Sequence, residues 1–142
     1  MAPDVRRPSV GLIAISAFFA VGAAASALTV VALLTPGGGL EPMWVLNPRA
    51  HEGFRSMGPW AFALMGTVGL ACALAARGIW TRARWGYRLA LTILALNVVG
   101  DVANALLSGD LRSLLGVPIG GGLIAYLSSA RVRARFGRSA AG

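Results

Sequence analysis

Long apolar runs alternate with short segments rich in glycine, proline and arginine along the whole chain. Four of these runs predict membrane-spanning helices, at residues 9–34, 58–76, 86–108 and 111–130. At a rise of about 1.5 Å per residue, the first run is ~39 Å long and the second ~28 Å, against a hydrocarbon core of ~30 Å. We therefore expect an all-α fold, a four-transmembrane-helix bundle, formed by a single integral membrane domain covering residues 1–142.

The first apolar run also has features of a secretory signal. Arg6 and Arg7 precede it, and residues 25–27 resemble a small-residue cleavage site. The apolar region of a signal is usually about 7–15 residues long, whereas this run continues through residues 28–34, past the candidate cleavage site. An uncleaved membrane anchor is therefore the better interpretation, with a cleaved signal as the alternative.

The longest connection, residues 35–57, contains a predicted helix of its own. Asn47 can cap this helix and Pro48 can serve as its first residue, because the missing N–H of proline costs nothing there. The helix would end near Met57, before Gly58. We expect it to lie on the bilayer surface as a short interfacial helix in the first outer loop. A loop that gates access to a substrate is the alternative interpretation.

Three polar residues of this helix are candidates for a site in the outer loop, namely His51, Glu52 and Arg55. We expect Phe54 and Met57 to form the apolar side of the helix. His51 and Glu52 would then point away from that side as a solvated pair, as such residues usually do.

Composition supports the membrane interpretation. Of the 142 residues, 56% are hydrophobic, and the mean hydropathy is +0.70, well above what the core of a soluble domain requires. The formal net charge of +8 comes from thirteen arginines, since the chain has no lysine. A basic balance can indicate a nucleic-acid partner, but the positions of the arginines make that partner unnecessary.

Ten of the thirteen arginines flank apolar runs on one predicted side of the membrane. They are Arg6, Arg7, Arg77, Arg82, Arg84, Arg88, Arg131, Arg133, Arg135 and Arg138, whereas Arg49, Arg55 and Arg112 fall on the other side. By the positive-inside rule, we expect both termini in the cytoplasm. The basic tail, residues 131–142, is expected to contact anionic lipid headgroups through its four arginines. All four tryptophans also fall near span ends, with Trp44 and Trp60 at the outer interface and Trp80 and Trp85 at the inner one.

A polar stripe interrupts the third apolar run. Asn97, Asp101 and Asn104 are spaced i, i+4 and i+7, so a helix places them on one face. Ionisable groups inside a membrane are costly and usually turn inward, so we expect Asp101 to face the interior of the bundle. Asp101 is the one acid inside any predicted span.

Two functions fit this stripe. In one, the chain is a structural or accessory membrane component that docks other membrane proteins through its glycine-rich faces. The amides and the carboxylate then join helices by hydrogen bonds, or Asp101 pairs with an arginine of the outer loop. In the other, Asp101 is a protonatable group of a small-molecule or ion-binding, transporter-like module, with Asn97 and Asn104 orienting the ligand.

Small residues recur at spacings that suit close helix contact. In the fourth run Gly116 and Gly120 form a GxxxG pair, which predicts helix packing through that face. In the first run the small-residue face is formed either by Gly22 with Ser26 or by Ala25 with Thr29. The partner of these faces is a helix of the same chain, a second copy in a homo-oligomer, or another membrane protein.

Catalytic chemistry has little support in the sequence. One histidine supplies no metal cluster, the single cysteine, Cys72, is expected to be a small buried side chain, and no nucleophile motif is present. We therefore expect no enzyme activity, no cofactor and no metal.

The C-terminal half resembles a class of small uncharacterised bacterial four-helix membrane proteins. The resemblance rests on residues 84–86, Asn97, residues 100–101, 104–107, 109–110, 116–120 and 126–127. It implies the four-span organisation and the bacterial cytoplasmic membrane, and it brings no known activity. Small multidrug transporters also have four short helices, but they depend on a membrane-embedded Glu in the first helix, which this chain lacks.

Overall fold

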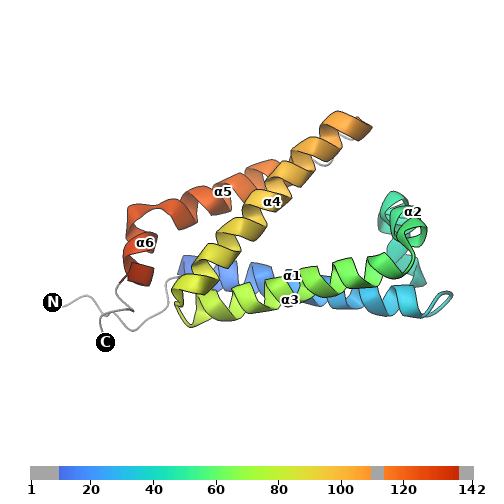
Figure 1. Cartoon of the computed structure of the whole chain (residues 1–142), viewed down its shortest axis with the longest axis horizontal. Coiled ribbons are helices and arrows are strands. Elements are labelled where there is room, and N and C mark those ends of the chain that lie inside the picture. The colour runs from blue at the N-terminus through green and yellow to red at the C-terminus, as the bar shows by residue number, and fades with distance from the viewer. Residues whose placement is uncertain (1–9, 110–113, 138–142) are drawn as a thin grey trace. The chain divides into compact units, whose positions relative to one another are not determined.

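The computed structural model describes residues 10–109 and 114–137, and every regular element within them is a helix (Figure 1). In chain order these are α1 (Val10–Leu34), the 3-10 helix η1 (Glu41–Leu46), α2 (Pro48–Met57), α3 (Pro59–Trp80), α4 (Arg84–Ser108), α5 (Gly116–Ser128) and α6 (Ala130–Gly137). The predicted all-α class is confirmed for this part of the chain. The predictions for Arg6, Arg7, Arg112 and Arg138 concern residues outside it.

Three of the described helices are long and apolar enough to cross a membrane: α1, α3 and α4 up to Leu107. The fourth predicted span is represented by α5, which has 13 residues. A helix of that length rises only ~20 Å, short of the ~30 Å hydrocarbon core. The described residues therefore contain three candidate membrane spans of the four predicted.

The turn between the second and third predicted spans is shorter than expected. We expected the second span to end at residue 76, but α3 continues to Trp80 and α4 begins already at Arg84. The N–H of Arg82 donates to the carbonyl of Ile79 (3.1 Å), and the N–H of Ala83 donates to that of Gly78 (2.8 Å). These two bonds form a Schellman motif, with Arg82 in the left-handed region at φ 55°. The motif satisfies the last carbonyls of α3, so the helix ends there rather than at residue 76.

The C-terminal segment also differs from the prediction. α5 begins at Gly116, which places Pro118 in the first turn, where its missing N–H breaks no helical hydrogen bond. After an extended residue at Ser129, the described part of the predicted basic tail, residues 131–137, belongs to the helix α6. Val132 and Phe136, four residues apart, are only 4% and 2% exposed. Burial of this apolar pair explains why a segment rich in arginine is helical.

The chain divides into two compact units, residues 19–73 and residues 1–18 with 74–142. Within residues 19–73, α1 packs on α3 through small side chains. A Cβ added at Gly22 would lie 3.5 Å from Sγ of Cys72, and one added at Gly69 would lie 3.1 Å from Cβ of Ser26. Ser26 is buried and Ala25 is exposed. The contact face of α1 is therefore the one formed by Gly22 and Ser26.

In the other unit, α5 runs back along α4 toward the residue where α4 begins (Figure 1). Gly116 lies against Asp101, and Gly120 lies against Val98 one turn nearer the start of α4. At the far end of α5, the Tyr87 hydroxyl donates to the Leu127 carbonyl at 3.2 Å. The two helices therefore pack antiparallel along most of the length of α5.

Candidate functional site

Asp101 lies at the contact between α4 and α5. A Cβ on Gly116 would collide with the Asp101 carboxylate, so the absence of a side chain at Gly116 makes room for the acid. Asp101 is half-buried, and Leu94, two turns earlier on α4, is buried. Val98 also faces α5, opposite Gly120. The contact side of α4 is thus formed by Leu94, Val98 and Asp101.

The two asparagines of the predicted stripe lie beside this contact rather than in it. Asn97 and Asn104 are both exposed, whereas Asp101 is half-buried. At 100° per residue, Asn97 and Asn104 point about 40–60° to one side of Asp101, and Val98 points about 60° to the other. The stripe therefore forms a polar flank along the α4–α5 pair, which we call the amide flank (Asn97, Asp101 and Asn104).

The two glycines of the GxxxG pair both meet α4, and Gly120 is buried. Gly121 and Gly122, next to it in sequence, have no neighbouring atom within 4 Å of the position that a Cβ would take. The pair therefore contacts a helix of the same chain.

A tighter glycine contact in the same unit was not identified from the sequence. A Cβ on Gly86 would collide with the backbone of Gly78, and one on Gly78 would collide with that of Gly86. Their only sequence signal is that small residues stand on both sides of a tight turn.

The connection between α1 and α3 folds around one aromatic side chain. Trp44 is 7% exposed, and its ring stacks on that of His51 with 4.4 Å between centroids and 7° between planes. The ring centroid of Phe54 lies 6.1 Å from that of the same indole. The prediction that His51 points away from the apolar side of α2 is therefore wrong. The reason is that η1 carries Trp44 onto α2, and the sequence pattern had not indicated a helix at residues 41–46.

The start of α2 was predicted correctly. The Asn47 side chain accepts a hydrogen bond from the N–H of Ala50 at 3.1 Å, and Pro48 is the first residue of the helix. The helix ends at Met57, and Gly58 follows with φ 55°. These contacts are local in sequence, which is why residue types alone indicated them.

A pocket of about 390 Å³ lies beside this aromatic stack. Its lining brings together the three predicted outer-loop candidates His51, Glu52 and Arg55, and adds Glu41, Trp44, Val45 and Pro48. Glu41 is held in place because its carboxylate accepts from the N–H of Gly37 at 3.1 Å. The Trp44 indole N–H is buried without a hydrogen-bond partner among the described residues. No group of three or more His, Cys, Asp or Glu side chains in residues 10–109 and 114–137 could hold a metal ion.

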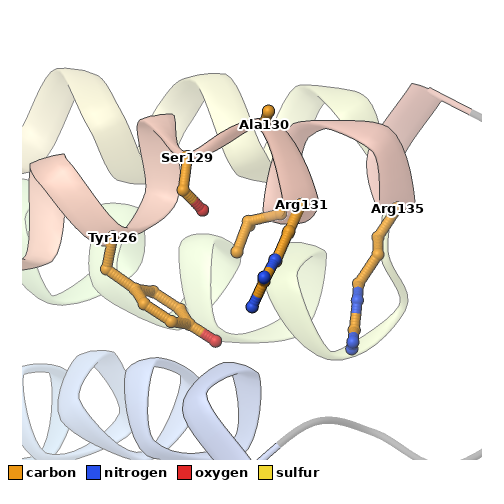
Figure 2. A pocket seen from close by; sticks show the side chains of 6 residues that line it. Tyr126, Ser129, Ala130, Arg131 and Arg135 are labelled. Carbon is orange, nitrogen blue, oxygen red and sulfur yellow. The ribbon is translucent and has the colours of Figure 1, made fainter.

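A second pocket, of about 630 Å³, lies where α5 meets α6 (Figure 2). It is lined by Tyr126, Ser129, Ala130, Arg131, Val132 and Arg135. We refer to it as the basic pocket. The sequence indicated its two arginines only as part of a tail. Tyr126 and Ser129 carried no signal, because they become neighbours of those arginines only through the bend at Ser129.

The basic pocket is fixed to the start of α4. The Arg84 guanidinium donates through Nε to the Phe136 carbonyl at 3.1 Å, and the Tyr87 and Phe136 rings lie 5.0 Å apart. The Tyr126 ring lies directly against Gly11 of α1, where a Cβ would collide with its hydroxyl. The first residues of α1 and α4 and the end of α5 therefore meet at one end of this unit.

The helices of residues 10–109 and 114–137 define a class of protein: it is all-helical, and three of these helices are long and apolar enough to cross a membrane. Comparison with protein-family models, with curated proteins and with solved structures finds no match to this chain.

Proposed function

We propose that the chain is a four-span protein of the bacterial cytoplasmic membrane that acts as a non-catalytic accessory component. In this proposal, the amide flank of α4 docks against a helix of another membrane protein. The observation that carries the proposal is the exposed amide of Asn97 in the middle of α4, a helix long and apolar enough to cross a membrane. An amide in hydrocarbon lacks water to bond with, so its free energy is lowered by hydrogen bonding to a partner helix.

Antiparallel packing of α5 on α4 supports a fourth crossing. α5 returns the chain from the level of Asp101 to that of Tyr87, near the first turn of α4. Arginines gather at the same end: Arg82 and Arg84 lie in the turn before α4 and at its first residue, and Arg131 and Arg135 belong to α6, which is bound to Arg84. With four crossings, both termini and this arginine-rich end lie in the cytoplasm, in accord with the positive-inside rule.

Topology can be measured with alkaline phosphatase, a reporter that is active only in the periplasm. We expect no activity from a fusion after Gly142 and high activity from a fusion after Gly38, in the outer connection. Equal expression of both fusions is checked by immunoblot. High activity after Gly142 would contradict the four-span topology and leave α5 as a segment that does not complete a crossing.

The face of α4 opposite the amide flank is apolar and exposed. Leu96, Val99 and Leu106 are 67%, 65% and 80% exposed. They lie roughly 140–160° from Asp101 around the helix axis. These apolar side chains suit contact with acyl chains, whereas the amide flank does not. An accessory role predicts this difference, with one face of α4 suited to lipid and the other suited to a partner helix.

Photocrosslinking in native membranes tests the docking proposal. A photoreactive amino acid replaces Asn97 in one variant and Val99 in a matched control on the same helix. We expect adducts of higher protein mass from position 97 and lipid adducts from position 99. Protein adducts at equal yield from both positions, lipid adducts alone from position 97, or an internal crosslink at the mass of the monomer would contradict the proposal.

Asp101 supports a second candidate function, a proton or cation site. The observation that favours it is the space that Gly116 of α5 leaves for the carboxylate of Asp101 on α4. Asp101→Asn is nearly isosteric and can still hydrogen-bond, so the fold should persist while proton-linked activity is lost. The measurement is proton flux into proteoliposomes, driven by a potassium diffusion potential and followed with a pH-sensitive dye. Wild-type flux no greater than that of protein-free vesicles would reject this candidate.

A further inference from the structure

We propose that the basic pocket between α5 and α6 binds a phosphate group, and that the headgroup of an anionic lipid supplies it. Arg131 and Arg135 are four residues apart on α6, and their side chains extend to the same side of the helix (Figure 2). The hydroxyls of Tyr126 and Ser129 lie on the α5 side of the same pocket. No carboxylate is among the lining residues.

This set of donors suits a tetrahedral oxyanion. A guanidinium presents a planar fork of N–H donors that matches phosphate oxygens in pairs, and such charge-assisted bonds are roughly twice as strong as neutral ones. Two forks with two hydroxyl donors could occupy several phosphate oxygens at once. The pocket volume of about 630 Å³ also leaves room for the rest of a headgroup.

The backbone that carries these donors is held by contacts that the ligand does not supply. Val132 and Phe136 anchor the inner side of α6, and the Phe136 carbonyl accepts from Arg84 of α4. A flexible basic tail would attract anions only through its summed charge. A helix fixed on α4 instead keeps Arg131 and Arg135 on the pocket side, while Arg133 is exposed and does not line the pocket.

The position of the pocket identifies a lipid as the source of the phosphate. α6 is bound to Arg84, the first residue of α4, and the exposed Trp85 follows it. In a membrane-spanning helix, arginine and tryptophan at the end lie at the level of the headgroups. Basic pockets at that level bind anionic headgroups. The inference rests on the proposed membrane insertion of α4, and neither the accessory role nor the orientation in the membrane enters it.

Native mass spectrometry of the full chain in detergent, titrated with phosphatidylglycerol, tests the inference. We expect Arg131→Gln and Arg135→Gln each to weaken binding about tenfold or more, since each removes charge-assisted hydrogen bonds. Arg133→Gln is the matched control, and it should weaken binding no more than about fivefold, the effect of one surface charge near the membrane. Phosphatidylcholine, which carries no net charge, should bind more weakly than phosphatidylglycerol to the wild-type protein.

Lysine substitutions distinguish the effect of the paired guanidinium hydrogen bonds from that of the positive charge. Arg135→Lys keeps the charge but loses the paired hydrogen bonds, so binding should weaken, whereas Arg133→Lys should leave it unchanged. If a glutamine variant fails to fold, these charge-preserving variants carry the test. Thermal unfolding in detergent identifies such a failure.

Inorganic phosphate distinguishes the two sources of the ligand. If the site takes a lipid, millimolar phosphate should not displace phosphatidylglycerol beyond sodium chloride of the same ionic strength. If phosphate displaces phosphatidylglycerol and this displacement depends on Arg131 and Arg135, the pocket is a phosphate site, but its ligand is the free anion and not a lipid. Equal losses in the Arg131, Arg133 and Arg135 variants, or no preference for phosphatidylglycerol over phosphatidylcholine, would overturn the inference. The topology and crosslinking results do not depend on these outcomes.

Discussion

Replacing Gly86 with alanine should destabilise the protein more than any other single methyl group added to the described helices. The backbones of α3 and α4 meet at Gly78 and Gly86, and a Cβ at either position would enter the other's main chain. A side chain could rotate away from such a clash, but backbone cannot, so the helices must separate. We expect a loss of about 3 kcal/mol, at the upper end of the usual cost of overpacking.

The matched control for this substitution is Gly100→Ala on the same helix. Gly100 has no neighbouring atom within 4 Å of the position a Cβ would take. Alanine there should stabilise the helix by about 0.5–1 kcal/mol, because glycine loses more backbone entropy on folding. The measurement is the thermal midpoint in detergent, with size-exclusion chromatography to check monodispersity. Equal midpoints for the Gly86 and Gly100 variants would show that the close contact of α3 and α4 is absent.

Gly120→Leu should have the second largest effect, because it separates α5 from α4. Gly120 is buried, and a Cβ there would lie 2.6 Å from Cγ2 of Val98. Leucine adds three further carbon atoms at the same place, so α5 must move or Val98 must leave its position. We expect a loss of about 2–3 kcal/mol in thermal or denaturant unfolding in detergent.

Gly122→Leu is the control for that experiment. Gly122 lies on the same helix, is exposed, and has open space at its Cβ position. A leucine there should not destabilise the protein, and by the entropy argument given for Gly100 it should stabilise the helix by up to about 1 kcal/mol. A second test uses the side chain that Gly120 meets: Gly120→Ala should be less costly in a Val98→Ala background than alone. If Gly120→Leu matched Gly122→Leu, the face of α5 that contacts α4 would have to be reassigned.

The amide flank and the basic pocket make different demands on the membrane environment. In the proposed function the flank contacts another protein, because lipid tails cannot bond to Asn97. The basic pocket is proposed to bind an anion, because its lining has two guanidinium groups and no carboxylate. Both features are compatible with one protein that is held in an anionic leaflet while it contacts a partner helix.

Features that depend on neighbours in sequence could be determined from the sequence alone. The apolar runs that form α1, α3 and α4 each reach the length of roughly 17–25 residues that a crossing needs, whatever packs against them. Asn47 caps α2 through a bond to a residue three positions on, and Gly58 ends it through its own backbone conformation. The spacing of Asn97, Asp101 and Asn104 likewise follows from helix geometry.

Tertiary structure decided which of these residues meet. Helix geometry places Asp101 between Asn97 and Val98, but only the position of α5 makes Val98 a contact and leaves Asn97 exposed. His51 lies under Trp44 because η1 turns toward α2. Residues 131–137 of the basic tail are helical because Val132 and Phe136 are buried, with the Phe136 ring against Tyr87 near the start of α4. In each case the stabilising free energy comes from contacts between atoms far apart in the chain. A pattern of residue types indicates which side chains are apolar, but not which surface of the protein will cover them.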